Sequence, residues 1–243
     1  MTIFECSKTK FISHRGFQPL APENSLPSFT YAGLLGQWAI ETDVRKTKDG
    51  ILVCCHNGEI DTYCDGVGAI AEMTLEELRR VPIVKGNRVD CFTAEERRIP
   101  TFSEYLAICK RYGCVPFVEL KTDDAEAVIH QLRAEGFSDE EVVMSATHAE
   151  RLYETRRVSE RMFVHWIFAK EEGLDAFATL GNAGISFRIA DPFACTPDQI
   201  ESAKRRGLRV CLRAADSVAT VARMKEMGLD YFPTNCMHDP LNQ

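Results

Sequence analysis

The chain repeats one pattern of apolar and polar positions about every 20–25 residues. Each repeat has an amphipathic segment that ends in glycine, and a short, almost continuously apolar run follows. The closing glycines are Gly36, Gly113, Gly136, Gly181, Gly207 and Gly228. Glycine suits the left-handed position that ends a helix, and continuous apolar runs are typical of parallel strands buried on both faces. The pattern therefore predicts alternating helices and parallel strands.

The apolar runs predict eight strands, each followed by a helix. The strands are expected at residues 11–14, 39–44, 115–120, 141–145, 162–167, 184–188, 208–212 and 229–232, with an additional hairpin arm at 51–55. Eight such units in a chain of this length fit a (β/α)₈ TIM barrel. An open doubly wound sheet is the alternative, although the G-x-G-x-x-G turn of a dinucleotide fold is absent after the first strand.

Helix starts are marked by threonines that have Glu or Gln three residues later, the spacing of a capping box. These pairs are Thr74 with Glu77, Thr147 with Glu150, and Thr196 with Gln199. Residues 57–100 interrupt the repeat, with one short helix expected near residues 74–80 and no sign of an independent core. We therefore expect a single domain over residues 1–243, with residues 57–100 as a small insertion after the second strand unit.

Composition narrows the class of protein. The net charge of −7 disfavours nucleic-acid binding, although it does not exclude a phosphate ligand. No apolar run approaches the roughly 20 residues that a membrane span needs, and the N-terminus lacks the order of a signal peptide. We expect a soluble, cytoplasmic protein without stable membrane insertion; its oligomeric state stays open. The ten cysteines show no C-x-x-C spacing, so reduced packing residues are favoured over a zinc site or disulfides.

Charged side chains gather where the first strands are expected to end, which is where active sites lie in TIM barrels. Glu41 and Asp43 share one face of their strand, and Glu119 and Lys121 share one face of the next, because side chains alternate along a strand. Carboxylates this close repel one another unless a cation intervenes. Oxygen ligands suit a hard cation, so we expect Glu41, Asp43 and Glu119 to bind Mg²⁺ or Ca²⁺.

Two histidines accompany these acids. His14 and His56 both titrate near neutrality and are candidates for an acid–base pair. The guanidinium of Arg15 fits the oxygens of a phosphate group. Two further residues have open interpretations. Trp166 could stack on a substrate group or pack at the rim, and Arg213 could contact an anionic alcohol or be a solvated charge.

The chain resembles the glycerophosphodiester phosphodiesterase family through a set of motifs in a fixed order. They are H-R-G at 14–16, P-E-N at 22–24, E-T-D at 41–43, T-K-D-G at 47–50, H-N at 56–57, I-P-T-F at 99–102 and V-E-L-K at 118–121. The resemblance implies a (β/α)₈ barrel that cleaves glycerophosphodiesters to an alcohol and glycerol 3-phosphate with a divalent cation. It also implies a small-molecule substrate and attack by the neighbouring glycerol hydroxyl through a cyclic phosphate.

The resemblance assigns roles residue by residue. It implies that Glu41, Asp43 and Glu119 hold the metal and that His14 and His56 are the acid–base pair. Arg15 and Lys121 would bind phosphate, and Glu23 would support Arg15 or the metal shell.

The sequence departs from the usual family pattern at four places. The family usually has H-D where this chain has His56-Asn57, and T-D where it has Thr234-Asn235. An R-T-T is usual near Thr62-Tyr63-Cys64, and W-T-V-N is frequent where this chain has C-L-R-A-A. No proposed catalytic group is lost, but the substrate pocket is left open. Hydrolysis of lysophospholipids or another phosphodiester on the same site is one alternative. A non-catalytic barrel that binds a phosphoryl ligand is another.

Overall fold

The computed structural model describes residues 3–6, 8–187 and 194–238. Its strands are β1 Phe11–Ser13, β2 Ala39–Lys46, β3 Leu52–Cys54, β4 Val115–Leu120, β5 Val143–Ala146, β6 Phe163–Ala169, β7 Ala183–Phe187, β8 Arg209–Cys211 and β9 Phe232–Thr234. The α-helices are α1 Leu26–Leu34, α2 Leu75–Arg79, α3 Phe102–Tyr112, α4 Ala125–Ala134, α5 Ala149–Val158, α6 Leu174–Ala178, α7 Pro197–Arg205 and α8 Val218–Glu226. Short 3₁₀ helices are η1 Ile70–Glu72, η2 Val89–Cys91, η3 Asp139–Glu141 and η4 Glu171–Gly173.

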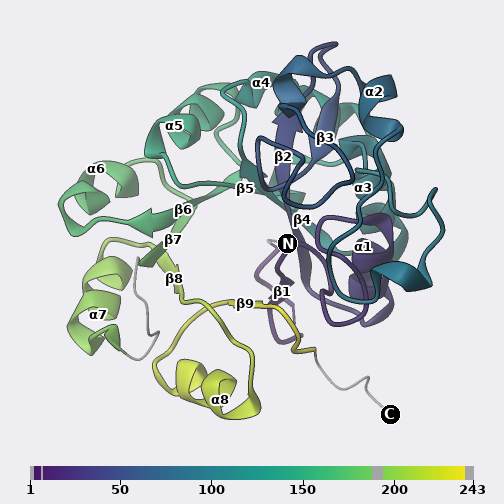
Figure 1. Cartoon of the computed structure of the whole chain (residues 1–243). Coiled ribbons are helices and arrows are strands. Elements are labelled where there is room, and N and C mark those ends of the chain that lie inside the picture. Colours follow the sequence, from purple (N-terminus) through teal and green to yellow (C-terminus); the bar gives the residue numbers. More distant parts are fainter. Residues whose placement is uncertain (1–2, 7, 188–193, 239–243) are drawn as a thin grey trace.

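The strands form a barrel, with helices around the outside (Figure 1). Neighbouring strands follow the order β8-β7-β6-β5-β4-β2-β1-β9, and all of these pairs are parallel. Backbone bonds join the two ends of this series, from Ala215 N–H to Pro233 O at 2.8 Å and from Asp230 N–H to Val210 O at 3.1 Å. The (β/α)₈ barrel is therefore confirmed, and the open doubly wound sheet is excluded.

Local structure follows the sequence signals in most places. The hairpin arm is β3, which pairs antiparallel with the end of β2. Thr74 and Thr196 cap α2 and α7 through capping boxes, as predicted. The box at Thr147 was wrong, because α5 begins one residue later, after His148, and has no side-chain cap.

The last strand was also misplaced, since it covers Phe232–Thr234 rather than residues 229–232. The apolar run begins earlier because Leu229 is still part of the turn that closes α8, where its N–H bonds to Met224 O at 3.1 Å. Part of the strand predicted at residues 184–188 lies outside the described residues at position 188.

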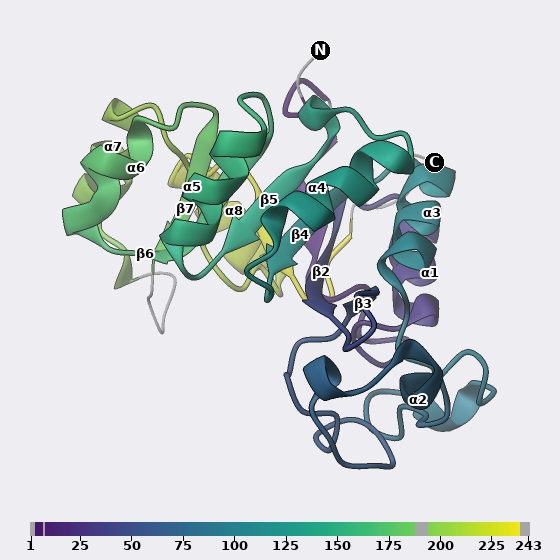
Figure 2. The same ribbon diagram turned by 90° about the horizontal axis from the view of Figure 1, so that it is seen from above.

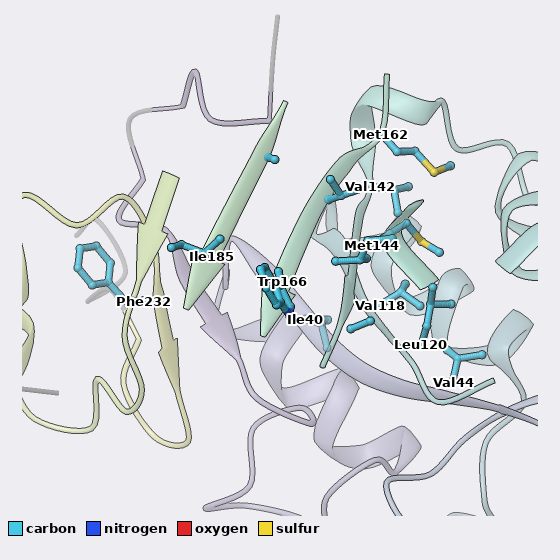
Figure 3. Close-up of a cluster of buried hydrophobic side chains, with 14 of the residues drawn as sticks. Ile40, Val44, Val118, Leu120, Val142, Met144, Met162, Trp166, Ile185 and Phe232 are labelled. Atoms are coloured by element: carbon cyan, nitrogen blue, oxygen red, sulfur yellow. The ribbon is translucent and has the colours of Figure 1, made fainter. Parts of the chain in front are cut away.

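Alternation along the strands sorts side chains into two cores. Outward-facing residues such as Ile40, Val118 and Met144 pack between the barrel and its helices (Figure 3). Inward-facing residues at the amino end of the barrel, among them Phe117 and Tyr231, pack around Phe4. The inside of the barrel is thus filled at one end, which leaves the carboxyl ends of the strands to form a site.

The insertion extends beyond one end of the barrel, next to β2 and β3 (Figure 2). Contrary to the sequence-based prediction, it has a small apolar core. The buried side chains of that core are Val53, Cys55, Ile60, Cys64, Ile70, Leu78, Ile83 and Ile99. The core went unpredicted because its apolar residues are spaced irregularly and because two of them lie outside the insertion, Val53 on β3 and Cys55 directly after it. Over the described part of the chain, no helix combines the length and hydrophobicity that a membrane crossing requires.

Candidate active site

A pocket lies at the carboxyl ends of the barrel strands and gathers side chains from both halves of the chain. Those that bear chemistry are His14, Arg15, Glu41, His56, Glu119, Lys121, His165 and Arg213. Glu41 and Asp43 lie on β2, and Glu119 lies beside them on β4, where it pairs in register with Asp43. The alternation predicted from the sequence therefore turns all three carboxylates to the inside of the barrel.

The three carboxylates form a group that could hold a metal ion. One ligand oxygen each of Glu41, Asp43 and Glu119 lies within 4.8 Å of the others, and no other such group occurs among the described residues. Asp43 Oδ1 is buried and accepts no hydrogen bond from any described residue. An all-oxygen donor set with an unsatisfied buried oxygen fits a hard divalent cation.

Electrostatics in the cluster are consistent with this fit. Burial, together with the nearby Asp43 and Glu119, raises the pKa of Glu41 well above its usual range. Burial and the Asp43 charge also raise the pKa of Glu119. Burial opposes ionisation of Asp43 too, but Lys121 and Arg15 outweigh it and lower the pKa of that carboxyl. Asp43 is thus the carboxyl group that ionises most readily, while burial and repulsion disfavour ionisation of Glu41 and Glu119.

Arg15 is held by an unusual turn directly after β1. Its backbone adopts a left-handed φ of 56°, which directs its N–H to Glu41 Oε2 at 2.8 Å. Its guanidinium bonds to Glu23 Oε1 at 2.9 Å and lies 3.5 Å from Asp43 Oδ2. Gly16 follows because the turn has no room for a side chain: a Cβ there would lie 2.4 Å from Ser28 Oγ.

Lys121 approaches the carboxylate cluster from β4. Its Nζ donates to Glu119 Oε1 at 2.5 Å and lies 3.4 Å from Asp43 Oδ1. Both cations predicted for phosphate binding therefore lie at the edge of the carboxylate cluster.

The two histidines lie on the same pocket, from different elements. His14 follows β1, and its Nδ1 lies 2.9 Å from Asn235 Oδ1. Burial and the charges of Arg213 and Arg15 lower the pKa of His14 to about 4. His56 follows β3, and its Nδ1 lies 2.8 Å from Asn57 Oδ1. Burial also lowers the pKa of His56, partly offset by Asp43. Both rings are therefore neutral near pH 7 in the absence of ligand.

Several residues around the site were not predicted. Asn24 donates to Asp43 Oδ2 at 2.9 Å and accepts from Thr42 Oγ1 at 2.8 Å, which orients the Asp43 carboxylate. Arg45 donates to His56 O at 2.6 Å and fixes the loop that carries this histidine. The P-E-N motif was a signal for Asn24. Nothing in the sequence marks Arg45, because its partner is a backbone carbonyl.

Trp166 does not lie on this pocket. On β6, His165 points inward, where it lines the pocket and lies 2.5 Å from Tyr231 Oη. The alternation of the strand therefore turns Trp166 outward, against Phe177, and Figure 3 shows it within the buried apolar cluster. Of the two interpretations left open for Trp166, its position favours packing, because it lies outside this pocket and its neighbour His165 takes the inward position.

Comparisons with known proteins agree with this geometry. The sequence model of the glycerophosphoryl diester phosphodiesterase family matches residues 14–238. A glycerophosphodiester phosphodiesterase of Caldanaerobacter subterraneus is 26% identical over 231 residues, which cover 92% of each chain. Glycerophosphodiester phosphodiesterase 1 of Mus musculus is 32% identical over 126 residues, 51% of this chain but only 38% of the mouse protein.

A solved structure shares the fold. A phosphodiesterase of Oleispira antarctica, in complex with the product sn-glycerol-3-phosphate, superposes with a TM-score of 0.83 at 22% identity, over 94% of this chain and 93% of its own. Since the family model spans nearly the whole chain, including both histidines and all three clustered carboxylates, the chain belongs to the glycerophosphoryl diester phosphodiesterase family.

Proposed function

We propose that this protein hydrolyses glycerophosphodiesters to an alcohol and glycerol 3-phosphate, with a divalent cation and a pair of histidines. One observation carries the proposal. A single pocket holds two histidines, two cationic side chains and a carboxylate cluster, the groups that phosphodiester cleavage needs. Family membership supports the reaction, and the small pocket supports a small-molecule phosphodiester as substrate.

Glu41, Asp43 and Glu119 would hold the cation, Mg²⁺ or Ca²⁺. When bound, it would supply neutralisation of phosphate charge and orientation of the attacking hydroxyl. Lys121 now contacts two of these carboxylates. We infer that Lys121 turns toward the phosphate when the carboxylates have a metal to bind.

Arg15 and Lys121 would bind the phosphate oxygens. Arg15 suits this role because Glu23 holds its guanidinium through a single nitrogen. NH1 lies 2.9 and 3.1 Å from the two carboxylate oxygens. Glu23 would thus position Arg15 without contacting the substrate. A planar guanidinium fixed in this way keeps its other donors available for an anion.

His14 and His56 would move the protons. One Nε2 accepts the proton of the attacking glycerol hydroxyl as that oxygen bonds to phosphorus. The other histidine takes up a proton when the anionic phosphate binds, and as the imidazolium it donates this proton from Nε2 to the alcohol oxygen as the bond from phosphorus to this oxygen breaks. Water then opens the cyclic phosphate with the two roles reversed. General acid–base catalysis of this kind contributes roughly 10²–10⁴-fold in rate.

The insertion would belong to the same functional unit. Residues 57–100 follow His56 directly, and Tyr63 lies beside Glu23, where burial and this carboxylate raise the pKa of Tyr63 to about 12. We therefore propose one catalytic domain that includes the insertion, rather than two domains.

The test is turnover by purified protein on glycerophosphocholine, glycerophosphoethanolamine, glycerophosphoglycerol, glycerophosphoinositol and lysophospholipids. Each is assayed with chelator, with Mg²⁺ and with Ca²⁺. We expect release of glycerol 3-phosphate only with metal, and loss of turnover in His14→Ala and His56→Ala at unchanged thermal stability.

The outcomes separate the alternatives. Cleavage of lysophospholipids in preference to the water-soluble diesters would identify lysophospholipids as the substrate class. Metal and diester binding without any cleavage would indicate a non-catalytic barrel. Turnover that survives in either histidine variant would remove that histidine from the mechanism.

A further inference from the structure

Each candidate histidine has an asparagine side chain against the same ring nitrogen. His14 Nδ1 lies 2.9 Å from Asn235 Oδ1, and His56 Nδ1 lies 2.8 Å from Asn57 Oδ1. Asn57 follows His56 directly, whereas Asn235 comes from the end of β9, 221 residues away from His14. Two unrelated elements thus produce the same contact, which suggests a shared purpose.

The orientation of the Asn235 amide follows from its other partner. Asp216 Oδ2 lies 2.7 Å from Asn235 Nδ2, and Asp216 Oδ1 accepts from the Asn235 N–H at 2.7 Å and from Thr234 Oγ1 at 2.9 Å. A carboxylate only accepts hydrogen bonds, so the amide must present its NH₂ to Asp216 and its oxygen to His14. His14 must therefore donate from Nδ1, because two lone pairs at 2.9 Å would repel each other.

Gln18 does not change this assignment. Its Nε2 lies 3.4 Å from His14 Nδ1, but it donates to His14 O at 2.9 Å and to Asn235 Oδ1 at 3.2 Å. Gln18 thus has two closer acceptors. Its contact with Asn235 Oδ1 further confirms that an oxygen occupies that position.

The Asn57 amide is oriented in a similar way, through a hydroxyl. Asn57 Nδ2 donates to Thr62 Oγ1 at 2.9 Å, and Thr62 Oγ1 donates to Asp61 Oδ1 at 3.4 Å. Because the hydroxyl proton points to Asp61, the Thr62 oxygen is an acceptor for the amide. The amide oxygen of Asn57 therefore faces His56, and this histidine also carries its proton on Nδ1.

We propose that Asn235 and Asn57 are positioning residues that hold His14 and His56 in the Nδ1–H tautomer, which leaves each Nε2 free to exchange protons with the substrate. Asp216 is a third positioning residue, because it sets which end of the Asn235 amide faces His14. The tautomer assignment is independent of the proposed function; the role in proton transfer rests on it.

The first test reads the tautomers directly. Long-range ¹⁵N–¹H spectra of the histidine rings distinguish a protonated from an unprotonated ring nitrogen, and His14→Gln and His56→Gln assign the signals. At neutral pH we expect both rings to carry the proton on Nδ1. In the substrate-free protein, a ring that carries its only proton on Nε2 would overturn the assignment for that residue, whatever the activity of the enzyme.

The second test measures kinetics in a set of variants at the Asn235–Asp216 contact. Asn235→Leu removes the acceptor, and we expect kcat to fall by at least about tenfold with little change in KM, a part of the roughly 10²–10⁴-fold that general acid–base catalysis contributes. Asn235→Asp alone places two carboxylates together and should also lower kcat. The exchange Asn235→Asp with Asp216→Asn restores a donor–acceptor pair and should recover kcat and the Nδ1–H signal.

A matched control is Asn182→Asp, the same chemical change at a residue that bonds to Arg161 O away from the pocket. It should leave kcat and the histidine spectra unchanged. Wild-type kcat in folded Asn235→Leu, or no recovery in the exchanged pair when it folds as stably as the wild type, would refute the positioning role.

A separate observation concerns Arg213, at the end of the β8 strand unit. Of the three cationic side chains that line the pocket, Arg15 pairs with Glu23 and Lys121 pairs with Glu119. No carboxylate among the described residues lies within ion-pair distance of Arg213. Two acids of the neighbouring strand units have other partners: Asp216 contacts Asn235, and Asp230 pairs with Arg209 at 3.0 Å.

The place of Arg213 in the barrel separates it from the carboxylate cluster. The carboxylate cluster lies on β2 and β4, whereas Arg213 follows β8, on the other side of β1 and β9 in the strand order. Apolar side chains, among them Phe117, Ile167 and Pro233, line the pocket together with these charged groups. A substrate whose phosphate lies at Arg15 and Lys121 would extend its remaining part toward Arg213.

We propose that Arg213 forms a subsite for a second negative charge, so that the preferred substrate is a diester whose alcohol bears a carboxylate or phosphate. This proposal deepens the proposed function and rests on it. A guanidinium that has no carboxylate partner in the described part of the chain can donate hydrogen bonds to such a group.

The test compares two diesters of glycerol 3-phosphate that differ in one group, one with lactate and one with propane-1,2-diol. We expect wild-type kcat/KM to favour the lactate diester by roughly tenfold, as for a charge-assisted hydrogen bond. Arg213→Gln should lose this preference, while Arg205→Gln, which removes an exposed charge on α7, should keep it.

Calorimetric binding of both diesters runs in parallel, so the preference is measured even without turnover. Equal affinity and equal kcat/KM for the two diesters in the wild type would overturn the subsite while leaving the proposed function intact. Binding preference without cleavage of either diester would overturn the function and leave the subsite.

Discussion

The carboxylate cluster makes a stability prediction that does not depend on turnover. Glu41→Gln removes one charge from three carboxylates whose ligand atoms lie within 4.8 Å of one another. The amide retains an oxygen that can accept from the Arg15 N–H, now 2.8 Å from Glu41 Oε2. The substitution therefore changes charge with little change in shape.

The expected magnitude follows from Coulomb's law. Two unit charges at the 4.8 Å limit repel by about 3.5 kcal/mol at an effective dielectric constant of about 20. Part of this repulsion is relieved by protonation of Glu41, which its raised pKa indicates, and by the charge of the nearby Arg15. We therefore expect metal-free Glu41→Gln to be more stable than wild type by about 1–3 kcal/mol, or about 2–10 °C in Tm for a chain of this size.

Metal should reduce or reverse this difference in stability between the wild type and Glu41→Gln. A cation at about one hundred times its Kd stabilises the wild type by about 2.7 kcal/mol. Glu41→Gln lacks one anionic ligand and should gain far less at the same concentration. The assay is differential scanning calorimetry in chelator and then in increasing Mg²⁺ or Ca²⁺, and the expected result is two titration curves that converge or cross.

Asp139→Asn is the matched control. Asp139 is a largely buried carboxylate too, but it is paired, with Arg133 Nε at 2.9 Å and NH2 at 2.7 Å. This variant should lose stability with and without metal and keep the wild-type response to metal. A lower metal-free Tm for Glu41→Gln, or an undiminished metal response, would refute the argument from charge repulsion.

Three further predictions concern the surroundings of the site. Burial lowers the pKa of His165 from 6.5 to about 3. As the pH falls from 6.5 to about 3, the unfolded chain binds a proton at His165 that the folded chain excludes, so the free energy of unfolding drops by up to about 1.4 kcal/mol per pH unit. In urea titrations at a series of acidic pH values, His165→Asn should therefore lose stability less steeply than the wild type. Gly16→Ala adds a Cβ 2.4 Å from Ser28 Oγ at a φ of +79°, and should lower the free energy of unfolding by about 2–4 kcal/mol in the same assay. Tyr63→Phe removes the hydroxyl beside Glu23, which holds Arg15, and should raise KM about two- to fivefold with kcat nearly unchanged.

Each of these changes has a control. His130 is exposed, so His130→Asn should leave the loss of stability at acidic pH unchanged. If it reduced this loss as much as His165→Asn does, burial of His165 would be excluded as the cause. Gly36→Ala has a φ of +66° but no atom within 4 Å, so it should destabilise less than Gly16→Ala. Tyr31→Phe on α1 should leave KM unchanged. A lower kcat at constant KM in Tyr63→Phe would contradict its action through phosphate binding.

The barrel was predictable because its signals are local. Most strands are nearly continuous apolar runs, and most helices have a glycine or a capping residue near one end. The errors arose where a residue that is typical of one structural element has another role. Leu229 is apolar because it closes α8 against the core, so the run starts before the strand does. Thr147 has capping spacing, yet the helix begins after His148.

The carboxylate group was foreseeable for the same reason. Glu41 and Asp43 are two positions apart on one strand, and Glu119 pairs in register with Asp43 on the next. Alternation alone places these side chains on one face. The same rule, applied to β6, turns His165 inward and Trp166 outward. That assignment could have been made from the sequence, since Phe163 and His165 alternate with outward-facing Val164.

The positioning contacts could not be foreseen. His14 and Asn235 are 221 residues apart, and only closure of the barrel brings β9 beside β1. An asparagine next to a histidine has no distinctive spacing, and the direction of its amide depends on a third residue. Asp216 supplies that direction from the loop after β8, so the tautomer of His14 depends on a contact among three separate elements.

This arrangement places two functions on one loop. Arg213 and Asp216 both follow β8, three residues apart. The first faces the pocket, and the second orients the amide that holds His14. A change in this loop that moves Arg213 would also move Asp216, and with it the proton-transfer geometry. Under the two proposals, the choice of alcohol and the orientation of the histidine are therefore not independent. Residues 211–215 and 234–235 both depart from the usual family pattern. Because the β8 and β9 strand units meet through Ala215 and Pro233, we interpret these departures as one coupled change.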